Sequence, residues 1–73
     1  MTPYLNLSAN SNVAYYKIFD NSICIQFTDG TIQNYSYEGG AGKDNVEQMK
    51  YLAIRGRGLG SFISSTVRFF HDQ

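Results

Sequence analysis

Apolar and polar residues alternate most clearly between residues 23 and 28. Ile23, Ile25 and Phe27 are separated there by cysteine and glutamine, and a threonine follows them. Successive side chains of a β-strand point to opposite faces, so this period of two places the three apolar residues on one face. The pattern predicts a half-buried strand.

Further strands are expected before and after this one. Residues 13–19 and residues 31–37 are rich in β-branched and aromatic residues, which favour extended structure. Asp20-Asn21-Ser22 carries short polar side chains that bond to the nearby backbone in turns, and Asp29-Gly30 is typical of a hairpin loop. The first half of the chain is therefore predicted to form a three-stranded antiparallel meander.

The register of the second hairpin depends on which side chains must share a face. A two-residue loop would place Ile23 opposite Ser36, whereas one additional loop residue, with Gly30 as a bulge, places Ile23 opposite Tyr35. We expect the bulge, because it gathers large apolar side chains on one face. That face comprises Ile23, Ile25, Phe27 and Tyr35, with Tyr37 at the end of the strand.

The apolar period changes from two to between three and four after the glycines at 39–42. The residues that share a face at this spacing are Val46, Met49, Leu52 and Ala53. This period predicts a helix from Asp44 to Ile54. Asp44, followed three residues later by Glu47, resembles a capping box at its start.

A second helix is expected with Ser61 as its N-cap, fraying near His71. Its positions with helical spacing are Phe62, Ile63, Thr66, Val67 and Phe70. The predicted fold is α+β, a three-stranded antiparallel β-meander followed by two short helices packed on one sheet face. We expect residues 1–11 to be a flexible lead-in and residues 12–71 to be a single domain.

Composition and charge narrow the class of protein. The chain has 73 residues and no net charge, but residues 1–40 carry one lysine against three carboxylates, and residues 41–73 carry five basic against three acidic side chains. A neutral domain lacks the basic surplus of most nucleic-acid-binding domains, although the second part of the chain allows a local basic face.

The single cysteine, Cys24, excludes an internal disulfide and favours a reducing compartment. No apolar run approaches the roughly 20 residues that span a bilayer, and the start of the chain lacks the pattern of a secretory signal. These features predict a cytoplasmic protein without membrane contact.

Residues 55–60 combine two arginines with three glycines between the two predicted helices. Glycine adopts backbone conformations that other residues avoid, and arginine carries a permanent charge on a planar set of donors. Such a turn at a helix start is suited to hold a phosphate or carboxylate. The candidate anion- or nucleic-acid-binding residues are Arg55, Arg57, Arg68 and Lys50. The same segment is also consistent with a plain connector, in which glycines allow tight turning and arginines are solvated.

Tyrosines on the predicted strands are a second candidate surface, because exposed aromatic rings stack on bases. These tyrosines are Tyr15, Tyr16, Tyr35 and Tyr37. Tyr15 and Tyr16 are adjacent and must point to opposite faces, and the register places Tyr35 in the core. Core packing is therefore the expected role of most of them, and an exposed pair would indicate a binding surface.

No group of residues in the sequence indicates catalysis. His71 is expected as a solvated residue near a fraying end, and Cys24 has no evident histidine and acid to activate it. The acidic residues fall at turns or helix starts, and no pair suggests metal binding or acid–base chemistry. We predict neither enzyme activity nor a cofactor.

The order of these elements resembles the KTSC domain, a family named for its occurrence at the C-terminus of some lysyl-tRNA synthetases. Ser11-Asn12-Val13 before an apolar strand is similar to the opening of that family. The pattern Ile23-x-Ile25-x-Phe27-x-x-Gly30 resembles its hairpin, and Tyr35 fits the second aromatic of its Tyr-x-Tyr strand.

The Gly-rich turn into Phe62-Ile63, followed by Val67-Arg68, is similar to the closing segment of the family. Gln33 stands where the family usually has its first tyrosine, and the proline common after the third strand is missing from residues 39–42. The resemblance covers roughly residues 8–70. It implies a small α+β module, usually free-standing, whose biochemical role is not established, and suggests contact with RNA or protein by association.

The sequence supports two hypotheses about function. The first is a small non-catalytic binding module that engages RNA or another nucleic acid through the basic Gly-rich turn between the helices. The alternative is a protein–protein interaction or homodimerisation module that uses an exposed sheet face or edge strand.

Overall fold

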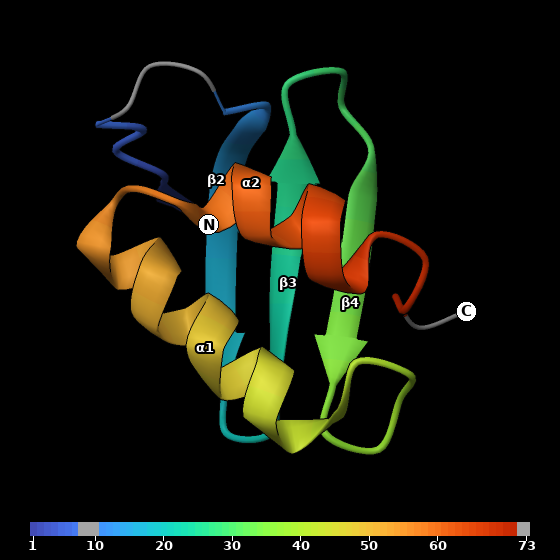
Figure 1. Ribbon diagram of the computed structural model, residues 1–73. Coiled ribbons are helices and arrows are strands. Elements are labelled where there is room, and N and C mark those ends of the chain that lie inside the picture. Colours follow the sequence, from blue (N-terminus) through green and yellow to red (C-terminus); the bar gives the residue numbers. More distant parts are fainter. Residues whose placement is uncertain (8–10, 72–73) are drawn as a thin grey trace.

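The computed structural model describes residues 1–7 and 11–71 and contains a four-stranded antiparallel sheet with helices on one face (Figure 1). The strands are β1 (Thr2–Pro3), β2 (Val13–Phe19), β3 (Ser22–Phe27) and β4 (Ile32–Ser36), in that order across the sheet. They are followed by α1 (Gly42–Arg55), α2 (Leu59–Phe62) and the π-helical segment η1 (Ile63–Val67). Part of the expected lead-in, residues 8–10, lies outside the described residues. The α+β class is confirmed, and the predicted number of strands is too small by one.

The additional strand β1 lies in the segment expected to be a lead-in coil. Thr2 and Pro3 pair with the edge of β2, where the missing N–H of a proline is tolerated. Tyr4 then enters the core, and its hydroxyl oxygen accepts a hydrogen bond from the backbone N–H of Leu59 at 3.2 Å. A strand of two residues has no detectable period, so the pattern of the sequence does not reveal it.

The predicted register of the β3–β4 hairpin is confirmed. Ile23 lies opposite Tyr35, and Gly30 has the left-handed φ of +91° that a glycine bulge requires. The N–H of Gly30 donates to the carbonyl of Phe27 at 2.9 Å. Ile23, Ile25 and Tyr35 are fully buried, as the shared face predicts.

Strand β2 contains a bulge that the sequence did not indicate. Val13 lies opposite Phe27 and Tyr16 lies opposite Ile25, and the register shifts between Val13 and Tyr15. Opposite residues share a face, so Val13 and Tyr16 both point towards the core although they are three positions apart. Tyr15 points to the other face of the sheet as a consequence.

Helix α1 begins two residues before the predicted start at Asp44. Its N-cap is Ala41, which makes no side-chain cap hydrogen bond, so the predicted capping box is wrong. Glu47 instead contacts Tyr37 and Lys50. The predicted apolar face is confirmed, with Val46, Met49 and Ala53 buried.

The second helical stretch also begins earlier than predicted. Gly58 is the N-cap of α2, so Ser61 lies inside the helix, where its carbonyl accepts a hydrogen bond from the Ser65 hydroxyl at 2.9 Å. The backbone then continues as η1, a π-helical geometry that is rare in proteins and frequent at functional sites. Within residues 1–7 and 11–71, no helix is long and apolar enough to cross a membrane.

The helices α1, α2 and η1 lie across the same face of the sheet, as predicted (Figure 1). The core lies between the two layers and forms one cluster. Its members are Tyr4, Val13, Ile23, Ile25, Tyr35, Ala41, Val46, Met49, Ala53, Leu59, Ile63 and Val67. The opposite face of the sheet carries no helix from the described part of the chain.

Candidate binding surfaces

Tight backbone packing shapes the α1–α2 turn. Gly56 ends α1 with a left-handed φ of +83°, and its N–H donates to the carbonyl of Leu52 at 3.0 Å. A Cβ on Gly56 would lie 2.9 Å from the Cβ of Leu5, and a Cβ on Gly60 would overlap the Ser11 hydroxyl. Both glycines therefore serve the packing of the fold, with or without a ligand at this turn.

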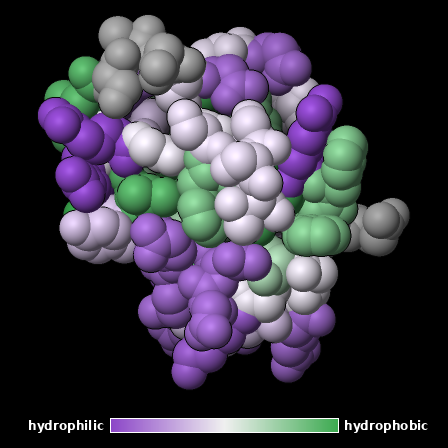
Figure 2. All heavy atoms as spheres, in the orientation of Figure 1, coloured by the Kyte–Doolittle hydropathy of each residue, from purple (hydrophilic) through white to green (hydrophobic). Residues whose placement is uncertain are grey.

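The four basic residues predicted as a site lie at three places. Arg55 ends α1 and Arg57 lies in the exposed turn, whereas Arg68 follows η1 at the far end of the α2–η1 segment (Figure 1). Lys50 lies within α1 and contacts the β2–β3 turn. Figure 2 shows hydrophilic side chains over the N-terminal half of α1 and a separate hydrophilic area at the α1–α2 turn. The structure does not gather the four residues on one face.

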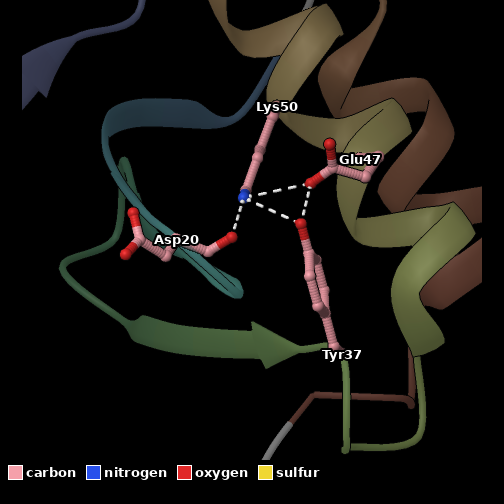
Figure 3. Close-up of polar contacts among 4 residues, drawn as sticks. All are labelled: Asp20, Tyr37, Glu47 and Lys50. Carbon is pink, nitrogen blue, oxygen red and sulfur yellow. Dashed lines mark hydrogen bonds and ion pairs between the residues drawn. The ribbon is translucent and has the colours of Figure 1, made fainter.

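Lys50 belongs to a polar cluster that joins three segments (Figure 3). Its Nζ donates to the carbonyl of Asp20 at 2.9 Å and to the hydroxyl of Tyr37 at 3.3 Å, and lies 3.0 Å from Oε2 of Glu47. The Tyr37 hydroxyl in turn donates to Glu47. The Lys50 side chain is only 13% exposed, so its ammonium group interacts with partners inside the protein and is poorly accessible to a ligand. We call these four residues the Lys50 cluster.

The contacts of the Lys50 cluster favour a charged Glu47, a charged Lys50 and a neutral Tyr37 at neutral pH. The hydrogen bond from Tyr37 lowers the pKa of Glu47, and the same bond raises the pKa of Tyr37. Partial burial acts to lower the pKa of Lys50, but its hydrogen bonds to Glu47 and Tyr37 outweigh this and raise it. None of these shifts moves a pKa towards neutral pH, which makes these groups poorly suited to proton transfer. The hydrogen bonds of the Lys50 cluster instead link α1 to the β2–β3 turn and to Tyr37.

The sheet face opposite the helices carries exposed aromatic rings on β2. Tyr15, Lys17 and Phe19 share this face because they alternate with Tyr16 and Ile18, which pair with core residues of β3. Tyr15 is 41% exposed and Phe19 is 45% exposed. The Nζ of Lys17 lies 5.3 Å from the centre of the Phe19 ring, a distance typical of a cation–π contact.

Cross-strand pairs extend this face over the other strands in three rows. The first row is Pro3, Tyr15, Gln26 and Ile32; the second is Lys17, Cys24 and Asn34; the third is Phe19, Ser22 and Ser36. We call these residues the open sheet face. It combines aromatic rings, amide and hydroxyl groups, and one positive charge with no carboxylate among the rows.

Of the four tyrosines proposed as stacking candidates, Tyr15 alone is exposed on the open sheet face. Tyr35 is fully buried, which raises the pKa of its phenol, and its hydroxyl donates to Gln33 at 3.2 Å. Tyr16 packs against the core and Tyr37 belongs to the Lys50 cluster. Phe19 was missed, although its even spacing from Tyr15 along β2 is a signal that the sequence contains.

A groove with a volume of about 520 Å³ lies between the β3–β4 hairpin and η1. Its lining includes Thr31, Gln33 and Tyr35 on the β4 side and Ile63, Ser64 and Arg68 on the helical side. Among the four basic residues predicted as a site, Arg68 is the one that lines this groove. The sequence does not reveal the groove, because its two sides are about 30 residues apart in the chain.

The groups considered for catalysis lie apart from one another. Partial burial raises the pKa of the Cys24 thiol, although the charge of Lys17 acts in the opposite direction. The His71 ring packs edge-on against Tyr35, with ring centres 6.4 Å apart, so His71 is half-buried, whereas the sequence predicted a solvated residue. In the part of the chain that the structure describes, no three His, Cys, Asp or Glu side chains gather closely enough to hold a metal ion.

Comparisons with protein-family models, with curated protein sequences and with solved structures find no match to this chain. The resemblance to the KTSC domain therefore stays a prediction that rests on the order of its motifs.

Proposed function

We propose that this protein is a small non-catalytic module that binds single-stranded nucleic acid on its open sheet face. The observation that carries the proposal is the pair of exposed aromatic rings, Tyr15 and Phe19, on either side of Lys17. Proteins that hold unpaired strands stack bases on aromatic side chains and contact the phosphates with cations. The open sheet face supplies both kinds of group on one strand, β2.

The spacing of these groups suits an extended strand of nucleic acid. Tyr15 and Phe19 are four residues apart, which corresponds to roughly 13 Å along β2, and Lys17 lies midway between them. One nucleic-acid strand is able to stack bases on both rings while a phosphate between those bases contacts the ammonium group of Lys17. Gln26 and Asn34 lie on the neighbouring strands of the same face, where their amides are able to bond to base edges.

The arginines give less support to nucleic-acid binding than the open sheet face does. Arg55 and Arg57 lie at the α1–α2 turn, far along the helical layer from Arg68, and Lys50 is bonded within its cluster. A phosphate-binding site needs several cations within reach of one backbone. A role of the turn arginines stays a prediction that the same experiment tests.

Binding of fluorescently labelled oligouridine and oligothymidine at low salt, measured by anisotropy, tests the proposal. Tyr15→Ala and Phe19→Ala are each expected to weaken binding about fivefold or more, since stacking contributes roughly 1–3 kcal/mol per base. Tyr51→Ala, which removes an exposed tyrosine from α1, is the matched control and should leave affinity unchanged. Lys17→Gln should flatten the salt dependence, because about one phosphate contact is lost.

Two results would contradict the proposal. One is the absence of oligonucleotide binding at low salt, and the other is binding that is lost in an Arg55→Ala/Arg57→Ala variant but kept in Tyr15→Ala. Self-association through the same face is the competing function, because Ile32 adds an apolar side chain that is 55% exposed. It would appear as concentration-dependent sedimentation that Tyr15→Ala abolishes, without any oligonucleotide binding.

A further inference from the structure

Strand β4 ends the sheet on the side of the groove. The carbonyl of Thr31 accepts a hydrogen bond from the N–H of Phe27 at 2.8 Å, so residues 31, 33 and 35 direct their backbone groups towards β3. The N–H and C=O groups of Ile32 and Asn34 must then point away from β3. An edge strand with outward backbone groups is a template on which another extended chain can pair.

The groove lies beside this edge, with η1 as its second wall. Ile63 and Arg68 are five residues apart, which places them along the same side of a π-helical segment, and Ser64 adds a hydroxyl next to them. The volume of about 520 Å³ falls within the range of roughly 300–1,000 Å³ that is typical of ligand sites. A chain paired with β4 would therefore place alternate side chains in the groove against η1.

The charges of the groove define which chains would fit. Arg68 is exposed, and the one ion pair within 4.0 Å among the described residues joins Lys50 and Glu47, not Arg68. Asp29 lies elsewhere in the lining, where the backbone N–H of Thr31 donates to its carboxylate at 2.9 Å and lowers its pKa. Asp29 repels a polyanion such as nucleic acid, whereas Arg68 attracts a single carboxylate.

We propose that this groove is a second binding site, which takes an extended peptide. The peptide adds as a strand to the outer edge of β4 and places a carboxylate against Arg68. Strand addition beside a helix is a recurring mode of peptide recognition, in which main-chain hydrogen bonds contribute affinity and the groove contributes specificity. The peptide site uses the backbone groups of Ile32 and Asn34 at the edge of β4, whereas the proposed nucleic-acid site uses side chains on the open sheet face, so either proposal can fail without the other.

Titration of the isotope-labelled protein with short peptides, followed by amide NMR spectra, tests this inference. The probe is an acetylated, amidated peptide of alternating valine and threonine that ends in glutamate, and the same peptide ending in glutamine is its control. The glutamate peptide should shift the amide resonances of Ile32, Asn34 and Arg68. The glutamine peptide, or Arg68→Gln in the protein, should bind about tenfold more weakly, because a charge-assisted hydrogen bond is lost.

Arg57→Gln is the matched protein control, since it removes an exposed arginine far from the groove and should leave binding unchanged. A glutamate peptide that is N-methylated at alternate residues should bind much more weakly if it pairs with β4, and this test leaves the protein unaltered. The inference is overturned if no resonance of β4 or η1 shifts at millimolar peptide. Equal binding by the Arg68→Gln variant, or by the N-methylated peptide, overturns it as well.

Discussion

The α1–α2 turn and the open sheet face both carry residue types that bind ligands, but the two regions differ in what those residues already contact. At the turn, Gly56 and Gly60 are packed against Leu5 and Ser11, so their conformations serve the fold. On the open sheet face, Tyr15 and Phe19 keep nearly half of their surface exposed. A ligand can use only those groups that the fold has left accessible.

Two lysines show the same difference. Lys50 donates to a backbone carbonyl and a tyrosine hydroxyl and pairs with Glu47, so its charge is satisfied within the protein. Lys17 is exposed, and the contact of its ammonium group is the face of the Phe19 ring. The charge of Lys17 thus remains available to a ligand on the open sheet face.

Gly56→Ala is expected to have the largest effect of the changes that probe this comparison. It should lower the free energy of unfolding by about 2–3 kcal/mol, because the left-handed conformation is strained for alanine and the new Cβ meets Leu5. Gly58→Ala is the matched control, with a φ of +86° but no atom closer than 3.5 Å to the new Cβ. Its loss should be about 1–2 kcal/mol, from strain alone. Equal urea midpoints for the two variants would show that the contact with Leu5 is unimportant.

Lys50→Met should lower the free energy of unfolding by about 1–2 kcal/mol, since it breaks the hydrogen bonds that join α1 to the β2–β3 turn and to the residue after β4. Lys17→Met removes the exposed lysine of the open sheet face and should change stability by less than about 0.5 kcal/mol. Chemical denaturation of both variants measures the difference. If Lys17→Met proved as destabilising as Lys50→Met, the contrast between the two lysines would be wrong.

Tyr15→Ala and Phe19→Ala should each lower the free energy of unfolding by less than about 1 kcal/mol, because each ring loses only cross-strand contacts. Each substitution should change the free energy of oligonucleotide binding by more than it changes the free energy of unfolding. Thermal melts recorded on the protein samples used for binding separate the two quantities. A loss of binding that only follows a loss of folded protein would remove the evidence for a binding surface.

The pH dependence of stability should show the smallest effect. The pKa of Glu47 is lowered from its ordinary value of 4.5, so the carboxylate stabilises the fold above that pH and this contribution is lost as the pH falls through the lower folded pKa. Glu47→Gln lacks this contribution, so its stability should decrease less than that of the unchanged protein between neutral pH and pH values below 4.5. Parallel pH curves would indicate that the Lys50 cluster does not depend on the charge of Glu47.

The elements that the sequence predicted well are those determined by neighbouring residues. The β3–β4 register followed from Gly30 and from the period of Ile23 and Ile25, all within one hairpin. The apolar face of α1 followed from a spacing of three to four residues. The helix starts were predicted less accurately. Asp44 and Ser61 are residue types that favour N-cap positions, but both lie inside the helices.

The candidate sites were harder to predict, because exposure depends on distant parts of the chain. The bulge after Val13 decides that Tyr15 faces away from the core and Tyr16 towards it, and the sequence around them gives no sign of this shift. The sequence therefore left open which of Tyr15 and Tyr16 is exposed, whereas Phe19 was missed because only tyrosines were considered as stacking residues. The groove was unpredictable for a related reason, since β4 and η1 come together only through the packing of the helices on the sheet.

The sequence by itself determined the α+β class, the hairpin register and the apolar face of α1, because those features arise from periods within a few residues. Tertiary structure decided which charged and aromatic side chains remain exposed. Lys50 finds its partners at Asp20 and Tyr37, which are 30 and 13 residues away. Gly56 and Gly60 meet Leu5 and Ser11 from the opposite end of the chain. Long-range contacts of this kind have no local period, so they become visible only when the chain is folded.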